Sequence, residues 1–246
     1  MFFDFDGIEN ARQLGGLTRP DGARIREDRL IRTGHLGRAT DGDIGRLAAL
    51  GVARVIDLRD IRECRRDPDR DIPGAAYLHL PALPDLMKVL PPVVGATPKQ
   101  AHEAFHAMYR ILALFPESID AYGAFFRELL AAEGKPVLWH CTQGKDRTGV
   151  GGMLLMSALG FDREAVIEEY LRTNIFAQKQ LDELRLARAS EEEIALLSEI
   201  FPVFETNARY YFECIEIEYG SLEAYLELAL GLGPEDIARL EEYYLE

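Results

Sequence analysis

The chain has 246 residues, of which 48% are hydrophobic and 28% are charged, and its formal net charge is −14. These proportions are ordinary for a soluble globular protein, and the acidic balance argues against nucleic acid as a partner. Three cysteines, Cys64, Cys141 and Cys214, are too few and too scattered for a disulfide framework or a zinc ribbon. No apolar run is long enough for a transmembrane segment and no signal-peptide pattern begins the chain, which predicts a cytoplasmic protein.

The first part of the chain alternates predicted strands with predicted helices. Strands are expected at residues 30–32, 52–58, 76–80 and 136–139. Helices are expected at residues 40–50, 98–115 and 117–132, the first of them opened by a capping box. The unbroken apolar run 52–58 is typical of a strand buried on both faces of a parallel sheet. The alternation predicts an α/β fold, a three-layer sandwich with a mostly parallel central sheet flanked by helices.

The rest of the chain is predicted to be almost entirely helical and to pack around this sheet. Helical segments are expected at residues 147–159, 162–174, 190–200, 202–219, 221–230 and 234–244. We therefore predict a single domain over residues 1–246. Within it, residues 86–115 are expected to form a lid-like insertion, and residues 161–246 the helical C-terminal part.

The stretch 136–150, PVLWHCTQGKDRTGV, joins a short strand, a glycine-bearing loop and a helix N-terminus. Such a loop forms an anion site, because its N–H groups point inward and the helix dipole adds positive potential. Cys141 begins the loop and is expected to exist largely as the thiolate. Arg147 ends it, and its planar fork can hold two oxygens of a phosphate. Nucleophile, cradle and clamp together indicate a phosphate monoester hydrolase that works through a phosphocysteine.

Each residue of this loop can be given a role. Cys141 is expected to attack phosphorus, and Thr148 to donate a hydrogen bond to its sulfur and ease the second step. His140 is expected to support the loop. No metal or cofactor is required. The backbone N–H groups that would hold the phosphate oxygens belong to Thr142, Gln143, Gly144, Lys145, Asp146 and Arg147.

Two other interpretations of the sequence remain. His102-Glu103-Ala-Phe-His106 is an HExxH pattern on a predicted helix, which could bind zinc with Glu128 as a third ligand and act as a metallopeptidase. A non-catalytic phosphate-binding module is the second. The presence of both Cys141 and Arg147 argues against it, because a module that only binds phosphate does not need the nucleophile.

The segment HCTQGKDRTG at 140–149 resembles the signature loop of the cysteine-dependent protein tyrosine phosphatases, and of their bacterial HCxxGKDRTG group in particular. The resemblance extends along the chain, to residues 10–16, 55–63, 84–86 and 219–225. It implies a protein tyrosine phosphatase fold and inorganic phosphate as product. It also implies substrates beyond phosphotyrosine: phosphoserine, phosphothreonine or phosphoinositides, with Lys145 as the cation for a second phosphate. Release from the cell without a standard signal peptide is compatible with it.

A leaving alkoxide or phenoxide needs a general acid. The sole tryptophan, Trp139, lies in a predicted strand, so the Trp-Pro-Asp loop of the classical tyrosine phosphatases is absent. Asp146 in the phosphate loop is the favoured candidate, because the loop fixes its position. Asp85, which the resemblance marks on a separate loop, is the alternative.

Overall fold

The structure, a computed structural model, describes residues 1–83 and 97–246. Five described strands form one sheet in the order β1–β2–β5–β3–β4. Neighbouring strands are parallel except at one edge, where β1 runs antiparallel to β2. The bounds are Arg12–Gln13 for β1, Leu30–Thr33 for β2, Arg54–Asp57 for β3, Ala76–His79 for β4 and Val137–His140 for β5. The predicted α/β fold with a mostly parallel sheet is confirmed.

The register brings the carboxyl ends of the central strands level with one another. His140 at the end of β5 is paired with Thr33 of β2 on one side and with Asp57 of β3 on the other. In parallel sheets, binding sites form outside the carboxyl ends of the strands. The loop that follows β5 therefore emerges between the ends of its two neighbours.

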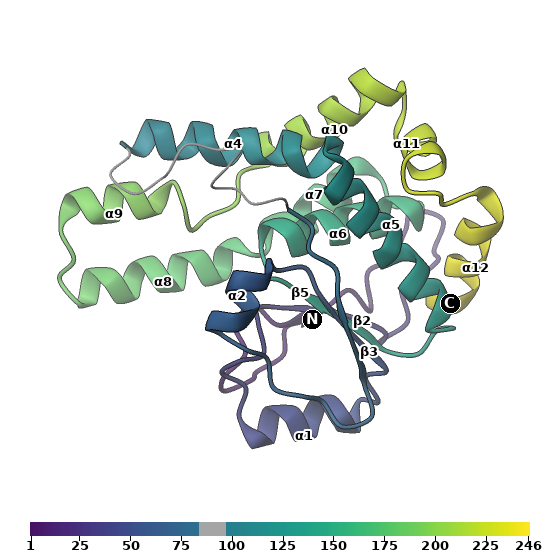
Figure 1. Ribbon diagram of the computed structural model, residues 1–246, viewed down its shortest axis with the longest axis horizontal. Coiled ribbons are helices and arrows are strands. Elements are labelled where there is room, and N and C mark those ends of the chain that lie inside the picture. The colour runs from purple at the N-terminus through teal and green to yellow at the C-terminus, as the bar shows by residue number, and fades with distance from the viewer. Residues whose placement is uncertain (84–96) are drawn as a thin grey trace.

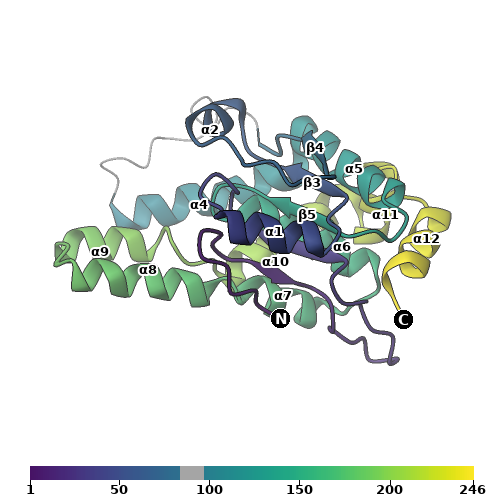
Figure 2. The ribbon, with the colours of Figure 1, turned by 90° about the horizontal axis from the view of Figure 1, so that it is seen from below.

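Helices cover both faces of the sheet, which gives the three layers (Figures 1 and 2). Helix α1 (Asp41–Ala49) packs Ile44 and Leu47 onto one face. The opposite face contributes to the larger core, which includes Trp139 and residues from α4, α5 and α6. Alternate residues of β2, β3 and β5 enter the two cores, so these strands are buried on both sides, as the apolar run at 52–58 predicts.

The remaining helices have the following bounds. They are α2 (Ile61–Arg66), α4 (Pro98–Leu114), α5 (Pro116–Ala131), α6 (Asp146–Ala158), α7 (Arg163–Leu171), α8 (Asn174–Leu186), α9 (Glu191–Ser198), α10 (Glu205–Tyr219), α11 (Leu222–Leu228) and α12 (Pro234–Tyr244). Helices α8 and α9 form an arm that extends away from the sheet beside the N-terminal half of α4 (Figures 1 and 2). In the described ranges no helix is both long enough and apolar enough to cross a membrane.

Two of these helices were not expected from the sequence. The short α2 has no buried residue, so it carries no hydrophobic periodicity, although Asp60 and Glu63 form a capping box at its start. Helix α8 buries only Ala177 and Leu181. The helix predicted at 162–174 ends at Leu171 in the structure, and after a short turn α8 begins at Asn174, where a loop was expected. Both helices lie next to the site described below.

The segment expected to form a lid falls into two parts. Residues 86–96 lie outside the described residues, as does Asp85. Residues 98–114 form α4, whose Tyr109 and Leu112 are fully buried in the larger core. This helix packs between α5 and α10, and it is therefore part of the fold that supports the site.

Candidate active site

The loop between β5 and α6 has the geometry of an anion site. Cys141 directly follows β5 and is 2% exposed, and α6 begins at Asp146 without a side-chain cap. Within residues 1–83 and 97–246 the backbone N–H groups of residues 142–147 have no hydrogen-bond acceptor. Gly144 has a φ of +69°, and a Cβ there would lie 2.3 Å from the carbonyl oxygen of Thr33. Only glycine allows the loop to pass this close to β2.

Side chains from the N-terminal part of the chain bind the carbonyl groups of the loop from outside. Asn10 Nδ2 donates to the carbonyl oxygens of Gln143 and Gly144, at 3.0 and 2.9 Å. Arg32 Nη2 donates to the same Gly144 oxygen at 3.0 Å. Because a peptide carbonyl and the following N–H point in opposite directions, these bonds direct the N–H groups toward the centre of the loop, where a phosphate would lie.

Glu169 of α7 holds the two arginines behind this arrangement. Its carboxylate lies 2.6 Å from Arg12 Nε and 2.7 Å from Arg32 Nη1, and all three side chains are at most 3% exposed. Burial alone would raise the pKa of Glu169, but Arg12 and Arg32 outweigh it and lower that pKa to about 2. Arg12 also donates to Asn10. One buried carboxylate therefore fixes both donors, Asn10 and Arg32, that orient the loop.

Arg147 is held by Glu63 of α2, a residue with no role predicted from the sequence. Its Nη1 and Nη2 donate to the two carboxylate oxygens of Glu63, at 2.5 and 2.8 Å. The Thr142 hydroxyl donates to the same carboxylate. Burial would raise the pKa of Glu63, but the hydrogen bonds and charge of Arg147 prevail and lower it to about 2. Two parallel hydrogen bonds of this kind fix the plane of the Arg147 guanidinium group. A phosphate that accepts hydrogen bonds from the same group must lie in that plane.

Glu63→Gln is expected to lower kcat/KM for an aryl phosphate by about 10–100-fold, because the amide has one acceptor oxygen and an NH2 donor, so it cannot form the two-point pair with both Nη groups of Arg147 and the clamp loses its orientation. Steady-state kinetics would measure the loss, with Glu168→Gln on the exposed face of α7 as the matched control. The two variants should have equal rates only if the pair has no role in orienting Arg147.

The same pair should contribute stability only where Glu63 is ionised. Its pKa is lowered on folding, so the contribution is present above the ordinary glutamate value of about 4.3 and is lost as pH falls through about 2. The difference in unfolding free energy between the wild type and Glu63→Gln should accordingly vanish in acid. A difference that persisted at pH 2 would point to packing instead of charge.

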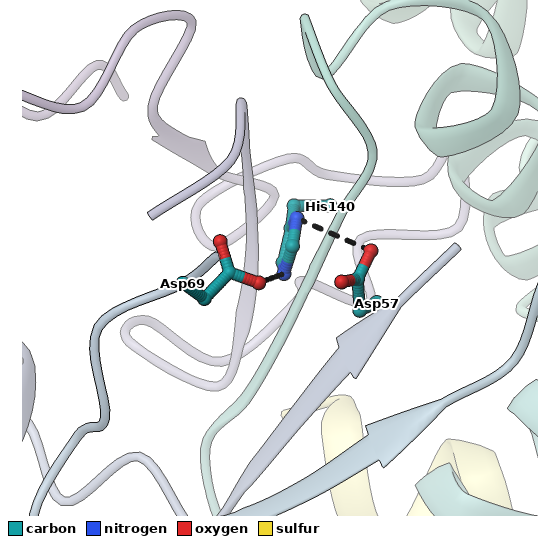
Figure 3. A group of neighbouring side chains, drawn as sticks. All are labelled: Asp57, Asp69 and His140. Atoms are coloured by element: carbon teal, nitrogen blue, oxygen red, sulfur yellow. Dashed lines mark ion pairs between the residues drawn. The ribbon is translucent and has the colours of Figure 1, made fainter. Parts of the chain in front are cut away.

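His140, which directly precedes Cys141, lies between two carboxylates (Figure 3). Its Nε2 is 3.2 Å from Asp69 Oδ2, and its Nδ1 is 3.8 Å from Asp57 Oδ1. Burial alone would lower the pKa of His140, but Asp69 and Asp57 raise it above the ordinary histidine value. The two carboxylates therefore favour the protonated form of the imidazole at the end of β5, directly before the phosphate loop.

Asp57, Asp69 and His140 are the one group of three potential metal ligands that the described part of the chain brings together. Arg59 already supplies the counter-charge, since its Nη2 lies 2.7 Å from Asp57 and 2.6 Å from Asp69. The group is therefore a buried ion-pair network that supports the loop.

Two tyrosines fix the aspartate at the start of α6. Tyr109 donates to Asp146 Oδ1 at 2.6 Å, and the hydroxyl groups of Tyr109 and Tyr170 are also 2.6 Å apart. Burial first, and the charge of Asp146 next, raise the pKa of Tyr109 well above its ordinary value, so this hydroxyl stays a donor. Asp146 is thus held beside the phosphate loop, while Asp85 lies outside the described residues.

The side chain of Lys145 contacts its neighbour in the chain, with Nζ 3.5 Å from Asp146 Oδ2. Lys145 is buried and its Nζ donates to the carbonyl of Ile200, between α9 and α10. Its Nζ also lies 5.1 Å from the ring centre of Phe105. The Thr148 hydroxyl is buried and has no hydrogen-bond partner within residues 1–83 and 97–246, so its expected bond to the Cys141 sulfur is not formed in this structure. Lys145 links the loop to the α8–α9 arm.

The histidines of the HExxH pattern are not arranged as a catalytic zinc site. His102 Nδ1 bonds to Glu199 at 2.9 Å, and His106 Nδ1 bonds to Asn207 at 2.8 Å. The carboxylate of Glu128, the expected third ligand, pairs with Arg54 instead. The pattern joins α4 to the segment around α9 and α10, so the metallopeptidase interpretation has no support.

A buried cysteine at the floor of an inward-facing N–H loop, with a fixed arginine beside it, defines a cysteine-dependent phosphatase. The family assignment agrees. The chain belongs to the tyrosine phosphatase family, whose model matches residues 3–246.

Relatives with curated names support the same class. A Cupriavidus necator protein that bears the name of a tyrosine-protein phosphatase is 35% identical over 98% of this chain and 87% of its own length. The triple specificity protein phosphatase PtpB of Mycobacterium tuberculosis is 34% identical over 61% of this chain and 62% of its own. A tyrosine-protein phosphatase of Nostoc commune is 28% identical over 88% and 74%. The chain is therefore a phosphatase, and neither alternative interpretation is supported by these matches.

Proposed function

We propose that the enzyme hydrolyses phosphotyrosine in proteins through a phosphocysteine on Cys141. The observation that carries the proposal is the loop itself, whose carbonyl groups are bound from outside by Asn10 and Arg32. The name of one relative states triple specificity, which supports testing phosphoserine and phosphothreonine as well. No metal ion or cofactor enters this mechanism.

The reaction has two steps. The Cys141 thiolate attacks phosphorus, an S–P bond forms, the P–O ester bond breaks and the leaving oxygen takes a proton from the general acid. Water then attacks phosphorus and gives a proton to the same carboxylate. The S–P bond breaks, inorganic phosphate leaves and the Cys141 thiolate is restored. The inward N–H groups and Arg147 stabilise the charge that spreads over the equatorial oxygens in both steps.

Asp146 is the proposed general acid, and its hydrogen bond from Tyr109 supports a fixed position beside the loop. Asp146→Asn is expected to lower kcat by about 10²–10⁴-fold on phenyl phosphate, whose poor leaving group needs a proton. The loss should be much smaller on 4-nitrophenyl phosphate. Asp85→Asn is the direct comparison and Asp120→Asn on α5 the control. If Asp85→Asn alone shows this dependence on the leaving group, the assignment moves to Asp85.

The function is tested by a substrate panel at mildly acidic pH in the presence of a chelator. Phosphotyrosine, phosphoserine and phosphothreonine peptides are compared for phosphate release, with Cys141→Ser as the blank. Release from phosphotyrosine that vanishes in Cys141→Ser is the expected result. If the wild type releases phosphate from none of the three, the proposal is rejected.

A further inference from the structure

A cleft of about 770 Å³ opens directly beside the phosphate loop. Thr142 and Gln143 of the loop form part of its wall, and the N-terminal segment 3–9 and helix α8 form much of the rest. We call it the N-terminal cleft. Because Thr142 and Gln143 belong both to the loop and to this wall, the cleft adjoins the phosphate site, and a substrate chain that left the site on this side would enter it.

Carboxylates outnumber the permanently charged cations on its walls. The carboxylates belong to Asp4, Asp6, Glu9, Asp67 and Glu183. The cations belong to Arg38, Arg66 and Lys179. Arg66 and Asp67 are paired with each other at 2.8 Å, so four carboxylates face two remaining cations. The cleft is therefore acidic although it adjoins a site for an anion.

Most of these carboxylates are available to a ligand. In the described part of the chain, Asp4, Asp6 and Glu183 form no ion pair, and Glu9 accepts only a 3.3 Å bond from the neutral side chain of Gln180. Asp4 and Asp6 come from the N-terminal segment, whereas Glu183 comes from α8. A cationic side chain in the cleft would meet carboxylates from both walls.

Aromatic rings give the same walls a surface for long aliphatic side chains. Phe3 and Phe5 are stacked with ring centres 5.3 Å apart, and Phe176 of α8 also lines the cleft. Lysine and arginine bury their methylene stems on such surfaces and keep the charged ends near carboxylates or over ring faces. Rings and carboxylates together match basic side chains.

The same charges oppose a ligand with several phosphates. Additional phosphate groups in the cleft would meet four unneutralised carboxylates. Lys145 of the loop does not line the cleft; it is bound to the Ile200 carbonyl and packs near Phe105. A phosphoinositide with further phosphates would therefore face four carboxylates and two cations, Arg38 and Lys179, in this cleft.

We propose that the N-terminal cleft binds the peptide next to the phosphorylated residue and selects segments that carry lysine or arginine. The inference rests on the proposed function and specifies its substrate class. Phosphotyrosine peptides with basic neighbours are the preferred substrates. Acidic neighbours are disfavoured, since like charges are brought together.

The test compares kcat/KM on two phosphotyrosine peptides that differ only in lysine or glutamate at the positions flanking the phosphotyrosine. The wild type should prefer the lysine peptide by about five- to tenfold at low salt, since each exposed pair contributes a small amount. The preference should shrink at about 0.5 M sodium chloride, where screening is stronger. Turnover of both peptides at equal rates would overturn the inference and leave the phosphatase function intact. No turnover of either would reject the proposed function itself.

Charge substitutions on the two walls test the site. The ratio of kcat/KM for the lysine peptide to that for the glutamate peptide should fall to about one in Asp6→Asn/Glu183→Gln. In Asp6→Lys/Glu183→Lys the preference should invert, so that the glutamate peptide is the better substrate. The ratio is measured within each variant, so a change in overall rate does not affect it. Glu227→Lys/Glu242→Lys, at the end of the molecule that carries α11 and α12, is the matched control and should keep the wild-type ratio (Figure 1).

Lipid is tested in parallel with vesicles of phosphatidylcholine that contain 5% phosphatidylinositol bisphosphate by composition. Slower hydrolysis of this lipid than of the lysine peptide is expected. Faster hydrolysis of the lipid, or a wild-type peptide ratio that the wall substitutions leave unchanged, would overturn the assignment of the cleft to a basic peptide.

Discussion

Arg147→Lys is expected to lower kcat/KM for phosphotyrosine by about 10²–10³-fold, the scale of losing a donor to the transition-state oxygens. Lysine keeps the positive charge but has no planar fork, so it cannot bind Glu63 through two nitrogens and also present two donors to a phosphate. The loss of kcat/KM in Arg147→Lys therefore measures the contribution of the guanidinium geometry, because the positive charge is retained.

Steady-state kinetics on a phosphotyrosine peptide would measure this loss, and circular dichroism would verify the fold of the variant. Arg239→Lys on α12 is the control, because that side chain is far from the loop and its contacts are with residues of the same helix, a 3.6 Å pair with Asp236 and the ring of Tyr243. A variant with more than about a third of the wild-type kcat/KM would show that Arg147 acts as a simple charge.

Glu169→Ala is expected to lower the free energy of unfolding by about 3–5 kcal/mol, because it leaves Arg12 and Arg32 buried without a counter-ion. Burial and the neighbouring charge of Arg32 already lower the pKa of Arg12 to about 10 in the intact network. Urea unfolding would measure the change. Glu164→Ala, which removes an exposed pair with Arg209, should cost at most about 1 kcal/mol. Equal losses in the two variants would contradict a structural role for the buried network.

A further substitution separates the two roles of this network, stability and orientation of the loop. Replacing Glu169, Arg12 and Arg32 together by Leu, Leu and Met removes every charge at once, which commonly restores stability lost from a broken buried pair. The Gly144 carbonyl would still lose its Arg32 donor. We expect a more stable protein than Glu169→Ala with turnover still reduced. Full recovery of turnover would mean that the arginines serve the fold alone.

The parts of the fold that follow from local sequence were predictable. The strand before the loop and the helix after it are contiguous with Cys141 and Arg147, so one stretch carries both the nucleophile and the clamp. Apolar runs and capping residues likewise marked β3 and α1. Helix α8 escaped prediction because it projects on an exposed arm and buries too few residues to show a period.

The supporting residues could not be placed in the same way. Glu63, Asn10, Arg32 and Glu169 are distant from the loop in sequence. The resemblance covers the segments of Asn10 and Glu63, but it does not say which residues they contact. Arg32 of β2 and Glu63, which follows β3, meet the loop because β5 lies between these two strands. Asn10 precedes the edge strand β1, and Glu169 joins the group from α7 through Arg12 and Arg32. The capping box at Asp60 could have located α2, and with it Glu63, beside that edge.

The ion pair between Arg12 and Glu169 also bears on when the enzyme becomes active. Arg12 and Arg32 precede their shared counter-ion by 157 and 137 positions, so contacts that orient the loop are among the most distant along the chain. A growing polypeptide leaves the ribosome N-terminus first and forms such distant contacts late. Cys141 and Arg147 are thus synthesised before the residue that completes their support. We expect a nascent chain that stops short of position 169 to carry the whole catalytic motif and yet turn over no phosphate ester.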